Sequence, residues 1–170
     1  MNRSESPKIL IVEDDAEQMA LFTSITLEEI EKLLSDENTS EQKRQTLQNI
    51  NILKVNNVDS LEKAIVKYSG VFLVIMDCNL PDSDNQTAHD QLIKTNHRIT
   101  GQHKPIDIVV RYLPNTPITM ISSFNRFHQL LHRYYKGKHA PGIAFISKRD
   151  ELKIRENITY HLMQYLTNTS

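Results

Sequence analysis

Four short apolar runs constrain the fold of this chain more than any other feature of its sequence. Each run has four to six residues, is rich in β-branched side chains and lacks period-two alternation; the runs are 9–12, 71–76, 118–121 and 143–146. Such runs are typical of strands whose two faces are both buried, as in a parallel sheet between two layers of helices. A weaker run at 52–55 predicts a fifth strand.

Amphipathic stretches between these runs predict helices. At 100° per residue, one apolar stripe of roughly 140° predicts a long first helix; its members are Met19, Phe22, Leu27, Ile30, Leu33 and Leu34. Asp59 and Glu62 predict a capping box at the start of the next helix. Pro105 favours a third helix over 106–113, and 86–97 is the rival position. Apolar stripes at 124–135 and 154–166 predict the last two helices.

The alternation of these elements predicts the fold class and the domain organisation. Strands and helices that alternate with short connections favour right-handed βαβ units, and therefore an α/β fold of three layers with a doubly wound parallel sheet. A length of 170 residues suits one domain. We expect a single domain over 1–170 with its core at about 8–166, a polar extension at about 35–49 and an insertion at about 83–104.

The composition excludes several classes of protein. A single cysteine, Cys78, excludes a disulfide framework and a Cys-x-x-Cys zinc or redox motif. The apolar runs are far shorter than the roughly 20 residues of a membrane helix, and the polar N-terminus does not resemble a signal peptide. We therefore expect a cytoplasmic protein without a membrane partner.

Charged and hydroxyl side chains follow the predicted strands where each strand ends. Glu13, Asp14 and Asp15 follow the first run, Asp77 the third strand, Ser122 the fourth and Lys148 the last. In open parallel sheets ligands bind at the carboxyl ends of the strands, so these side chains are expected to lie together. Clustered carboxylates favour Mg²⁺, and a lysine opposite the metal suits a phosphoryl group. The sequence therefore predicts phosphoryl-transfer chemistry at this edge.

The same blocks resemble those of a known family. In chain order, the sequence resembles the signature blocks of response-regulator receiver domains of two-component signalling, including stand-alone receivers of the chemotaxis type. The blocks are Lys8–Asp15, Val74–Asp82, Pro117–Ser123 and Ala144–Lys148. The resemblance covers about 8–166 apart from the extension and the insertion. It implies a flavodoxin-like fold with a five-stranded parallel sheet of order 2-1-3-4-5.

The resemblance also implies a role for individual residues. Asp77 corresponds to the phosphoacceptor, and Lys148 to the lysine that pairs with a phosphoryl oxygen. Asp14 corresponds to a direct Mg²⁺ ligand and Glu13 to an indirect one, and the backbone carbonyl of Asn79 to a further ligand. The family also has a switch pair. Ser122 corresponds to its hydroxyl, which bonds the acyl phosphate, and Phe145 to its aromatic ring, which turns inward.

The chain departs from the family pattern at two places. Arg149 follows Lys148, where the family usually has a proline after a cis bond. A cis bond before a residue other than proline costs about 2.5–4 kcal/mol, so this replacement bears on the reach of Lys148. Asp84 and Asn85 stand near the position of the glycine that commonly follows the phosphoacceptor, and asparagine tolerates the same left-handed conformation.

The expected function is that of a receiver which is not an enzyme beyond its own phosphorylation and dephosphorylation. The implied donors are a sensor histidine kinase or a histidine phosphotransfer protein, and the implied output is a downstream protein that binds the 123–145 surface. Nine Lys/Arg and one acid between Arg98 and Arg149 indicate an acidic partner. A protein partner is preferred to nucleic acid because the sequence has no helix-turn-helix or other reading module.

Two alternatives remain open at this stage. One is a degenerate receiver that acts as an adaptor and binds its partner without phosphorylation. The other is a Mg²⁺-dependent phosphohydrolase with an aspartyl-phosphate intermediate. Its dehalogenase-type form requires a second aspartate two residues after the nucleophile, and the chain has Asn79 there.

Overall fold

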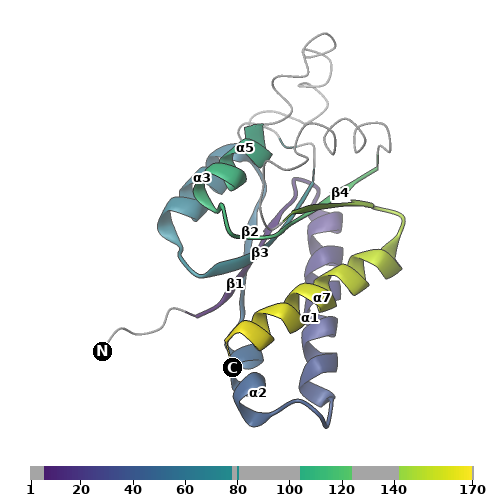
Figure 1. The fold of residues 1–170 in the computed structure, drawn as a ribbon. Coiled ribbons are helices and arrows are strands. Elements are labelled where there is room, and N and C mark those ends of the chain that lie inside the picture. The colour runs from purple at the N-terminus through teal and green to yellow at the C-terminus, as the bar shows by residue number, and fades with distance from the viewer. Residues whose placement is uncertain (1–5, 78–79, 81–103, 124–141, 170) are drawn as a thin grey trace.

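The strands of this protein form one parallel sheet. The computed structural model describes residues 6–77, 80, 104–123 and 142–169 (Figure 1). Its five strands are β1 (Lys8–Val12), β2 (Asn51–Val55), β3 (Val71–Asp77), β4 (Ile118–Ser122) and β5 (Ile143–Ser147). They are all parallel and follow the order β2-β1-β3-β4-β5. The predicted fold class and strand order are therefore confirmed.

Burial along the strands follows their position in the sheet. Every residue of β1 and β4 is buried, and so is all of β3 except Phe72. The edge strands β2 and β5 are only partly covered. The prediction of two buried faces is thus right for the three central strands and wrong for the 143–146 run, because β5 lies at the edge of the sheet, where its faces are less fully covered.

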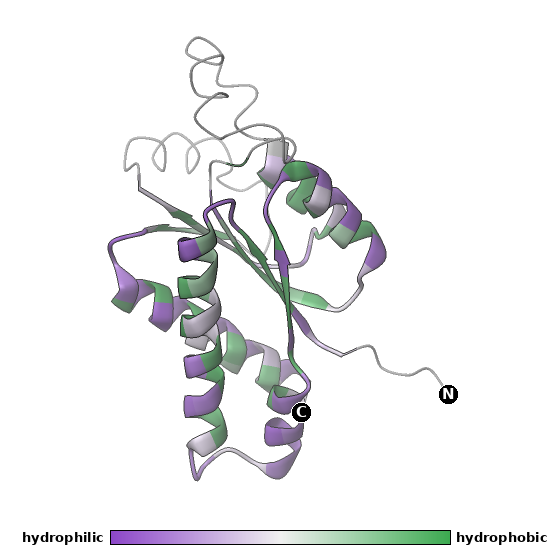
Figure 2. Ribbon diagram, turned by 180° about the vertical axis from the view of Figure 1, so that it is seen from behind, coloured by the Kyte–Doolittle hydropathy of each residue, from purple (hydrophilic) through white to green (hydrophobic). Residues whose placement is uncertain are grey.

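Helices cover both faces of the sheet. They are α1 (Ala16–Ser35), α2 (Glu41–Gln48), α3 (Val58–Lys67), α5 (Lys104–Tyr112) and α7 (Glu151–Asn168). Helices α1 and α7 pack together on one face, and α3 and α5 on the other (Figure 1). Figure 2 shows the apolar residues on the strands and on the sheet-facing sides of the helices. The core therefore consists of two apolar layers, one on each side of the sheet.

Each layer has its own set of buried side chains. The layer under α3 and α5 includes Leu61, Ile65, Ile106 and Val109 against Val74 and Met76 of β3. The layer under α1 and α7 includes Phe22, Ile25, Ile154 and Ile158 against Ile9, Ile11 and Ile75. Because residues of a strand alternate between the faces, β1 and β3 contribute to both layers.

Helix α1 is rotated relative to the predicted stripe. Its buried residues are Phe22, Ile25, Thr26, Glu29, Ile30 and Leu33, and the predicted core residue Leu27 is 46% exposed. The rotation places Glu29 inside, where Arg155 Nη1 (3.1 Å) and Thr159 Oγ1 (2.8 Å) of α7 donate to its carboxylate. The prediction for Leu27 is wrong because these partners lie more than a hundred residues away in the sequence.

One local prediction also needs correction, and the predicted polar extension contains a helix that no apolar stripe in the sequence indicates. The polar extension at 35–49 contains the helix α2, which Ser40 caps and whose Leu47 is buried. Helix α3 starts one residue before Asp59, because the side chain of Asn57 accepts from the Ser60 amide and acts as the N-cap. The predicted capping box of Asp59 is therefore wrong. Figure 1 shows that α1 extends past the sheet and that α2 returns toward it.

The remaining helix predictions have different outcomes. Helix α5 confirms the placement behind Pro105, and α7 confirms the last predicted helix. The rival position at 86–97, the helix at 124–135 and nearly all of the 83–104 insertion lie outside the described residues. Within the part of the chain that the structure describes, no helix is both long and apolar enough to cross a membrane.

Candidate functional site

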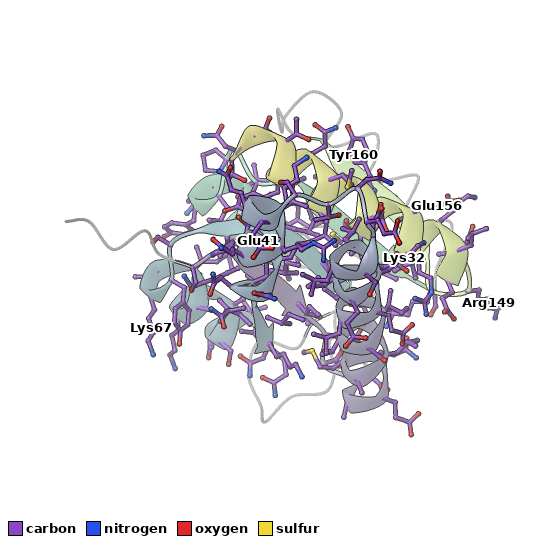
Figure 3. The ribbon with its side chains drawn as sticks, turned by 90° about the horizontal axis from the view of Figure 1, so that it is seen from below. Lys32, Glu41, Lys67, Arg149, Glu156 and Tyr160 are labelled. Carbon is purple, nitrogen blue, oxygen red and sulfur yellow. The ribbon has the colours of Figure 1, made fainter. Side chains whose placement is uncertain are left out.

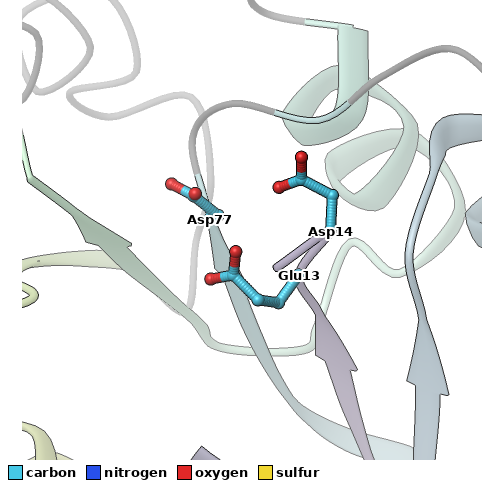
Figure 4. A group of neighbouring side chains, drawn as sticks. All are labelled: Glu13, Asp14 and Asp77. Carbon is cyan, nitrogen blue, oxygen red and sulfur yellow. The ribbon is translucent and has the colours of Figure 1, made fainter. Parts of the chain in front are cut away.

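The carboxyl ends of β1 and β3 bring three acids together. Strand β1 runs into Glu13 and Asp14, and β3 ends at Asp77. One carboxylate oxygen from each of these residues lies within 4.8 Å of the others. Figure 4 shows the three side chains side by side at the ends of their strands. The parallel order of the sheet places β1 directly beside β3, so residues far apart in the sequence meet at this edge. The predicted acidic cluster is therefore present.

Lys148 completes this cluster from the last strand. Its Nζ donates to Glu13 Oε2 and to Asp77 Oδ2, each at 2.9 Å. The Lys148 side chain is 15% exposed, and those of Glu13 and Asp77 are 0% and 10% exposed. The ammonium thus bridges two largely buried carboxylates. In a site with little water such a pair interacts more strongly than it would at the surface.

Burial and mutual repulsion shift the protonation of the acids. Burial, helped by the negative charge of Asp77, raises the pKa of Glu13 to about 7, although Lys148 opposes this. Partial loss of water around Asp14 also raises its pKa, although the residue as a whole is exposed. For Lys148, burial favours the neutral amine, but the two carboxylates outweigh it and raise its pKa. With its three carboxylates ionised, the cluster therefore carries more negative charge than the single ammonium of Lys148 neutralises.

This set of donors fits a divalent cation such as Mg²⁺. Three carboxylates provide the oxygen ligands that Mg²⁺ prefers, and Asp14 is exposed, which leaves room for the waters that Mg²⁺ retains. With all three acids ionised, Lys148 leaves the group with net negative charge, which a divalent cation would offset. The carbonyl of Asn79, the further ligand that the resemblance implies, lies outside the described residues.

The replacement of proline by Arg149 does not prevent Lys148 from reaching the site. The Lys148–Arg149 peptide bond is trans, and the Lys148 amide donates to the Ser122 carbonyl at 3.0 Å. Arg149 itself is exposed and points away from the body of the molecule (Figure 3). The hydrogen bond to Ser122 at the end of β4 therefore holds the backbone of Lys148, and its side chain reaches the acids without a cis bond.

Ser122 and Phe145 lie on neighbouring strands close to this edge. Ser122 is the last residue of β4, is 3% exposed and is paired in register with Ser147. Phe145 lies on β5, opposite Met120, where it is half-buried and packs against the layer under α3 and α5. The positions of these two residues suit a coupling between the site and the surface, and their roles remain a prediction.

Asp15 has a role that differs from the other acids of its triplet. Its Oδ1 accepts hydrogen bonds from the amides of Glu17 and Gln18, both at 2.9 Å, so it is the N-cap of α1. The sequence contained a signal for this role, because aspartate directly before a helical stripe is a preferred cap. Asp15 is predicted with the other acids at the sheet edge, whereas its side chain binds the first turn of α1.

Known proteins match this chain in structure. No family model matches the sequence, and no curated protein matches it. Solved structures nevertheless superpose over nearly the whole chain. One is the signal receiver domain of an HD domain-containing protein from Pseudomonas fluorescens Pf-5, with a TM-score of 0.54 and 13% identity over 99% of this chain and 95% of that one.

Two further structures show the same similarity. A response regulator receiver protein from Sinorhizobium medicae WSM419 has a TM-score of 0.51 and 10% identity, and covers 93% of this chain and 98% of its own. The response regulator domain of Thermotoga maritima CheB has a TM-score of 0.50 and 15% identity, with coverages of 95% and 96%. The fold is that of a receiver domain. At such low identity, the receiver fold by itself does not establish the chemistry of this site.

Proposed function

We propose that this chain is a single receiver domain, with its core at about 8–166, which accepts a phosphoryl group on Asp77. The donor is the phosphohistidine of a sensor histidine kinase or of a histidine phosphotransfer protein, and the cofactor is Mg²⁺. One observation carries this proposal. The carboxylate of Asp77 lies at the end of β3 with two further acids within 4.8 Å and with the Lys148 ammonium at 2.9 Å.

The residues of the site suit each part of the transfer. An oxygen of the Asp77 carboxylate attacks phosphorus, a new P–O bond forms, and the P–N bond to the imidazole of the donor breaks. The imidazole leaves with the electron pair of that bond and takes a proton. Lys148 already contacts Asp77 Oδ2, so its ammonium is within reach of a phosphoryl oxygen on that carboxylate. Positioning and charge neutralisation are the main requirements of such transfers.

The metal would be held by the acids of the same edge. Asp14 and Asp77 would bind Mg²⁺ directly, Glu13 through water, and the backbone carbonyl of Asn79 would be a further ligand. Both oxygens of Glu13 already accept hydrogen bonds, from Lys148 and from the Asp15 amide, which favours the indirect role. When bound, Mg²⁺ supplies positive charge that offsets the negative charge of the phosphoryl oxygens.

The output of the domain would be a change at its surface. In this proposal Ser122 bonds the acyl phosphate, Phe145 turns inward, and the 123–145 surface shifts between two populations that a downstream protein distinguishes. No catalytic turnover is required beyond self-phosphorylation and self-dephosphorylation. The domain would act in the cytoplasm with protein partners, without a membrane or nucleic acid.

Intact-mass spectrometry after incubation with acetyl phosphate and Mg²⁺ tests the proposal. We expect one phosphoryl adduct on the wild type, and none in Asp77→Asn or after removal of Mg²⁺ with EDTA. Asp59→Asn is the matched control, because it removes an exposed carboxylate on α3 and should leave the adduct unchanged. An adduct that persists in Asp77→Asn would contradict the assignment of the acceptor.

A second experiment separates the receiver from an adaptor that works without phosphorylation. If acetyl phosphate gives no adduct, phosphorylated histidine phosphotransfer protein replaces it as the donor. The absence of an adduct with both donors, together with the absence of beryllofluoride–Mg²⁺ binding, would overturn the proposal in favour of the adaptor. Repeated turnover of a small phosphate ester would instead favour a phosphohydrolase.

A further inference from the structure

We propose that Asp15 is a positioning residue for Mg²⁺: it fixes the turn between β1 and α1 and thereby the two acids before it, without binding the metal itself. The inference rests on the magnesium site of the proposed function and assigns different roles to the adjacent acids Glu13, Asp14 and Asp15. All three residues carry a carboxyl group, but the structure gives each of them different partners.

The side chain of Asp15 is committed to the helix. Its Oδ1 accepts from the amides of Glu17 and Gln18, both at 2.9 Å, and its carbonyl accepts from the Met19 amide at 2.9 Å. An N-cap carboxylate satisfies amides that have no partner within the helix and interacts favourably with the helix dipole. Turning this side chain toward a metal would break both side-chain bonds and would leave the first turn of α1 without its cap.

The backbone of Asp15 is tied to the site. Its amide donates to Glu13 Oε1 at 3.3 Å, while Lys148 donates to Glu13 Oε2 at 2.9 Å. The Glu13 amide donates in turn to the Val55 carbonyl of β2 at 3.0 Å. The carboxylate of Glu13 is therefore held from two sides, and one of these contacts depends on the backbone position of Asp15.

Asp14 lies between two residues that are both fixed. Glu13 is anchored in the sheet and Asp15 in α1, whereas the side chain of Asp14 is exposed. Among the described residues, the acids whose oxygens come within 4.8 Å of one another are Glu13, Asp14 and Asp77. The backbone of the turn between β1 and α1 thus sets the direction of Asp14 toward Asp77. Asp15 fixes the end of that turn where α1 begins.

Calorimetric titration of Mg²⁺ into charge-matched variants tests this assignment. Asp15→Asn removes the charge but keeps an oxygen that caps the helix, so we expect a Kd within about twofold of the wild type. Asp15→Ala removes the cap as well, and we expect Mg²⁺ to bind about fivefold more weakly, the factor that corresponds to a typical N-cap. Asp14→Asn is the reference for a ligand and should weaken binding more than either.

A cap elsewhere in the chain provides the matched control. Ser40 caps α2 through the Lys43 amide, on a helix that follows the far end of α1. We expect Ser40→Ala to lower the thermal midpoint, as Asp15→Ala does, and to leave the Kd for Mg²⁺ unchanged. This comparison separates the loss of a cap from the loss of a positioned site.

The outcomes that overturn the assignment are distinct. If Asp15→Asn weakens Mg²⁺ binding as much as Asp14→Asn, Asp15 acts through its charge as a ligand; this holds even if Asp15→Ala fails to fold. An unchanged Kd in Asp15→Ala would also overturn it, and so would the absence of Mg²⁺ binding to the wild type. Binding of Mg²⁺ without a phosphoryl adduct on Asp77 from either donor, and without binding of beryllofluoride, would overturn the proposed function and leave the assignment of Asp15 standing.

Discussion

At the scale of single residues, the ionised carboxylate of Glu13 suits the candidate site but lowers the stability of the metal-free fold. The residue is 1% exposed and lies beside Asp77, and burial together with this neighbour raises its pKa from 4.5 to about 7. The folded protein therefore binds the proton more tightly than the unfolded chain. The stabilisation from this group is complete below pH 4.5 and is lost as the pH rises through about 7. It amounts to about 3 kcal/mol at most.

Glu13→Gln should remove this pH dependence from the metal-free protein. We expect the free energy of unfolding of the wild type in urea and EDTA to be lower at pH 8 than at pH 5. The variant should show a smaller difference between the two pH values. Asp14 accounts for part of the difference that remains, because its pKa is raised too. Urea unfolding followed by circular dichroism measures both.

Glu29→Gln is the control for this experiment. Hydrogen bonds from Thr159 and Arg155 outweigh the burial of Glu29 and lower its pKa. Its contribution is therefore present above the pKa of the unfolded chain and is lost only in acid. Glu29→Gln should lower stability by similar amounts at pH 5 and pH 8. Equal pH dependence in the wild type and Glu13→Gln would contradict the assignment to Glu13.

At the scale of elements, α7 is tied to the rest of the molecule by polar contacts as well as apolar packing. Thr119 of β4 donates a hydrogen bond to Asn157 of α7. Arg155 binds Glu28 and Glu29 of α1 and also Glu151 of its own helix. These contacts fix the helix that follows Lys148 against both β4 and α1. The helix after β1 and the helix after β5 are thus joined by polar contacts as well as by packing.

The elements could be predicted from sequence where local periodicity determines them. The strands and α5 follow from runs of neighbouring residues, whose burial depends on a simple repeat. The error in α1 has a different origin. Glu29 is buried because Arg155 stands 126 residues later, and no local pattern contains that partner. The sequence does not predict α2 because a single buried residue, Leu47, forms no apolar stripe.

We expect α2 to contribute to the stability of the fold through its one buried side chain, Leu47. The side chain is 2% exposed and packs in the layer under α1 and α7. We expect Leu47→Ala to lower the free energy of unfolding by about 2–5 kcal/mol, because it removes buried methyl groups and leaves a cavity. Urea unfolding measures the loss, and Gln48→Ala, an exposed change on the same helix, should cost about 0.5 kcal/mol or less. Equal effects would contradict a core role for α2.

At the scale of the whole molecule, the candidate site exists because the fold is a parallel sheet. Glu13 and Lys148 are 135 residues apart and meet only through the order of the strands. Sequence reasoning could find these residues, since every parallel strand carries its last residues to the same edge. The sequence also contained a signal for a cap among the adjacent acids, but which of Asp14 and Asp15 caps α1 depends on which backbone amides lie within reach.

The same topology gives Ser122 a direct connection to β5. The Ser122 carbonyl accepts the amide of Lys148 at 3.0 Å, and Ser122 pairs in register with Ser147. A movement of Ser122 toward an acyl phosphate would therefore disturb the hydrogen bond at the end of β5. That strand also carries Phe145, which packs on the layer under α3 and α5. A change at the candidate site would therefore have a short physical route to β5 and Phe145.

Hydrogen exchange with beryllofluoride, a mimic of the phosphoryl group, tests this route. In the wild type with Mg²⁺, we expect beryllofluoride to change exchange in peptides that cover residues 142–148. Ser122→Ala should lose most of this change while Mg²⁺ still binds, because the acids and Lys148 are intact. Ser24→Ala, an exposed hydroxyl on α1, is the control and should respond like the wild type. If Ser122→Ala also retains the full response, β5 senses the site through the Lys148 side chain, and Ser122 is not the switch.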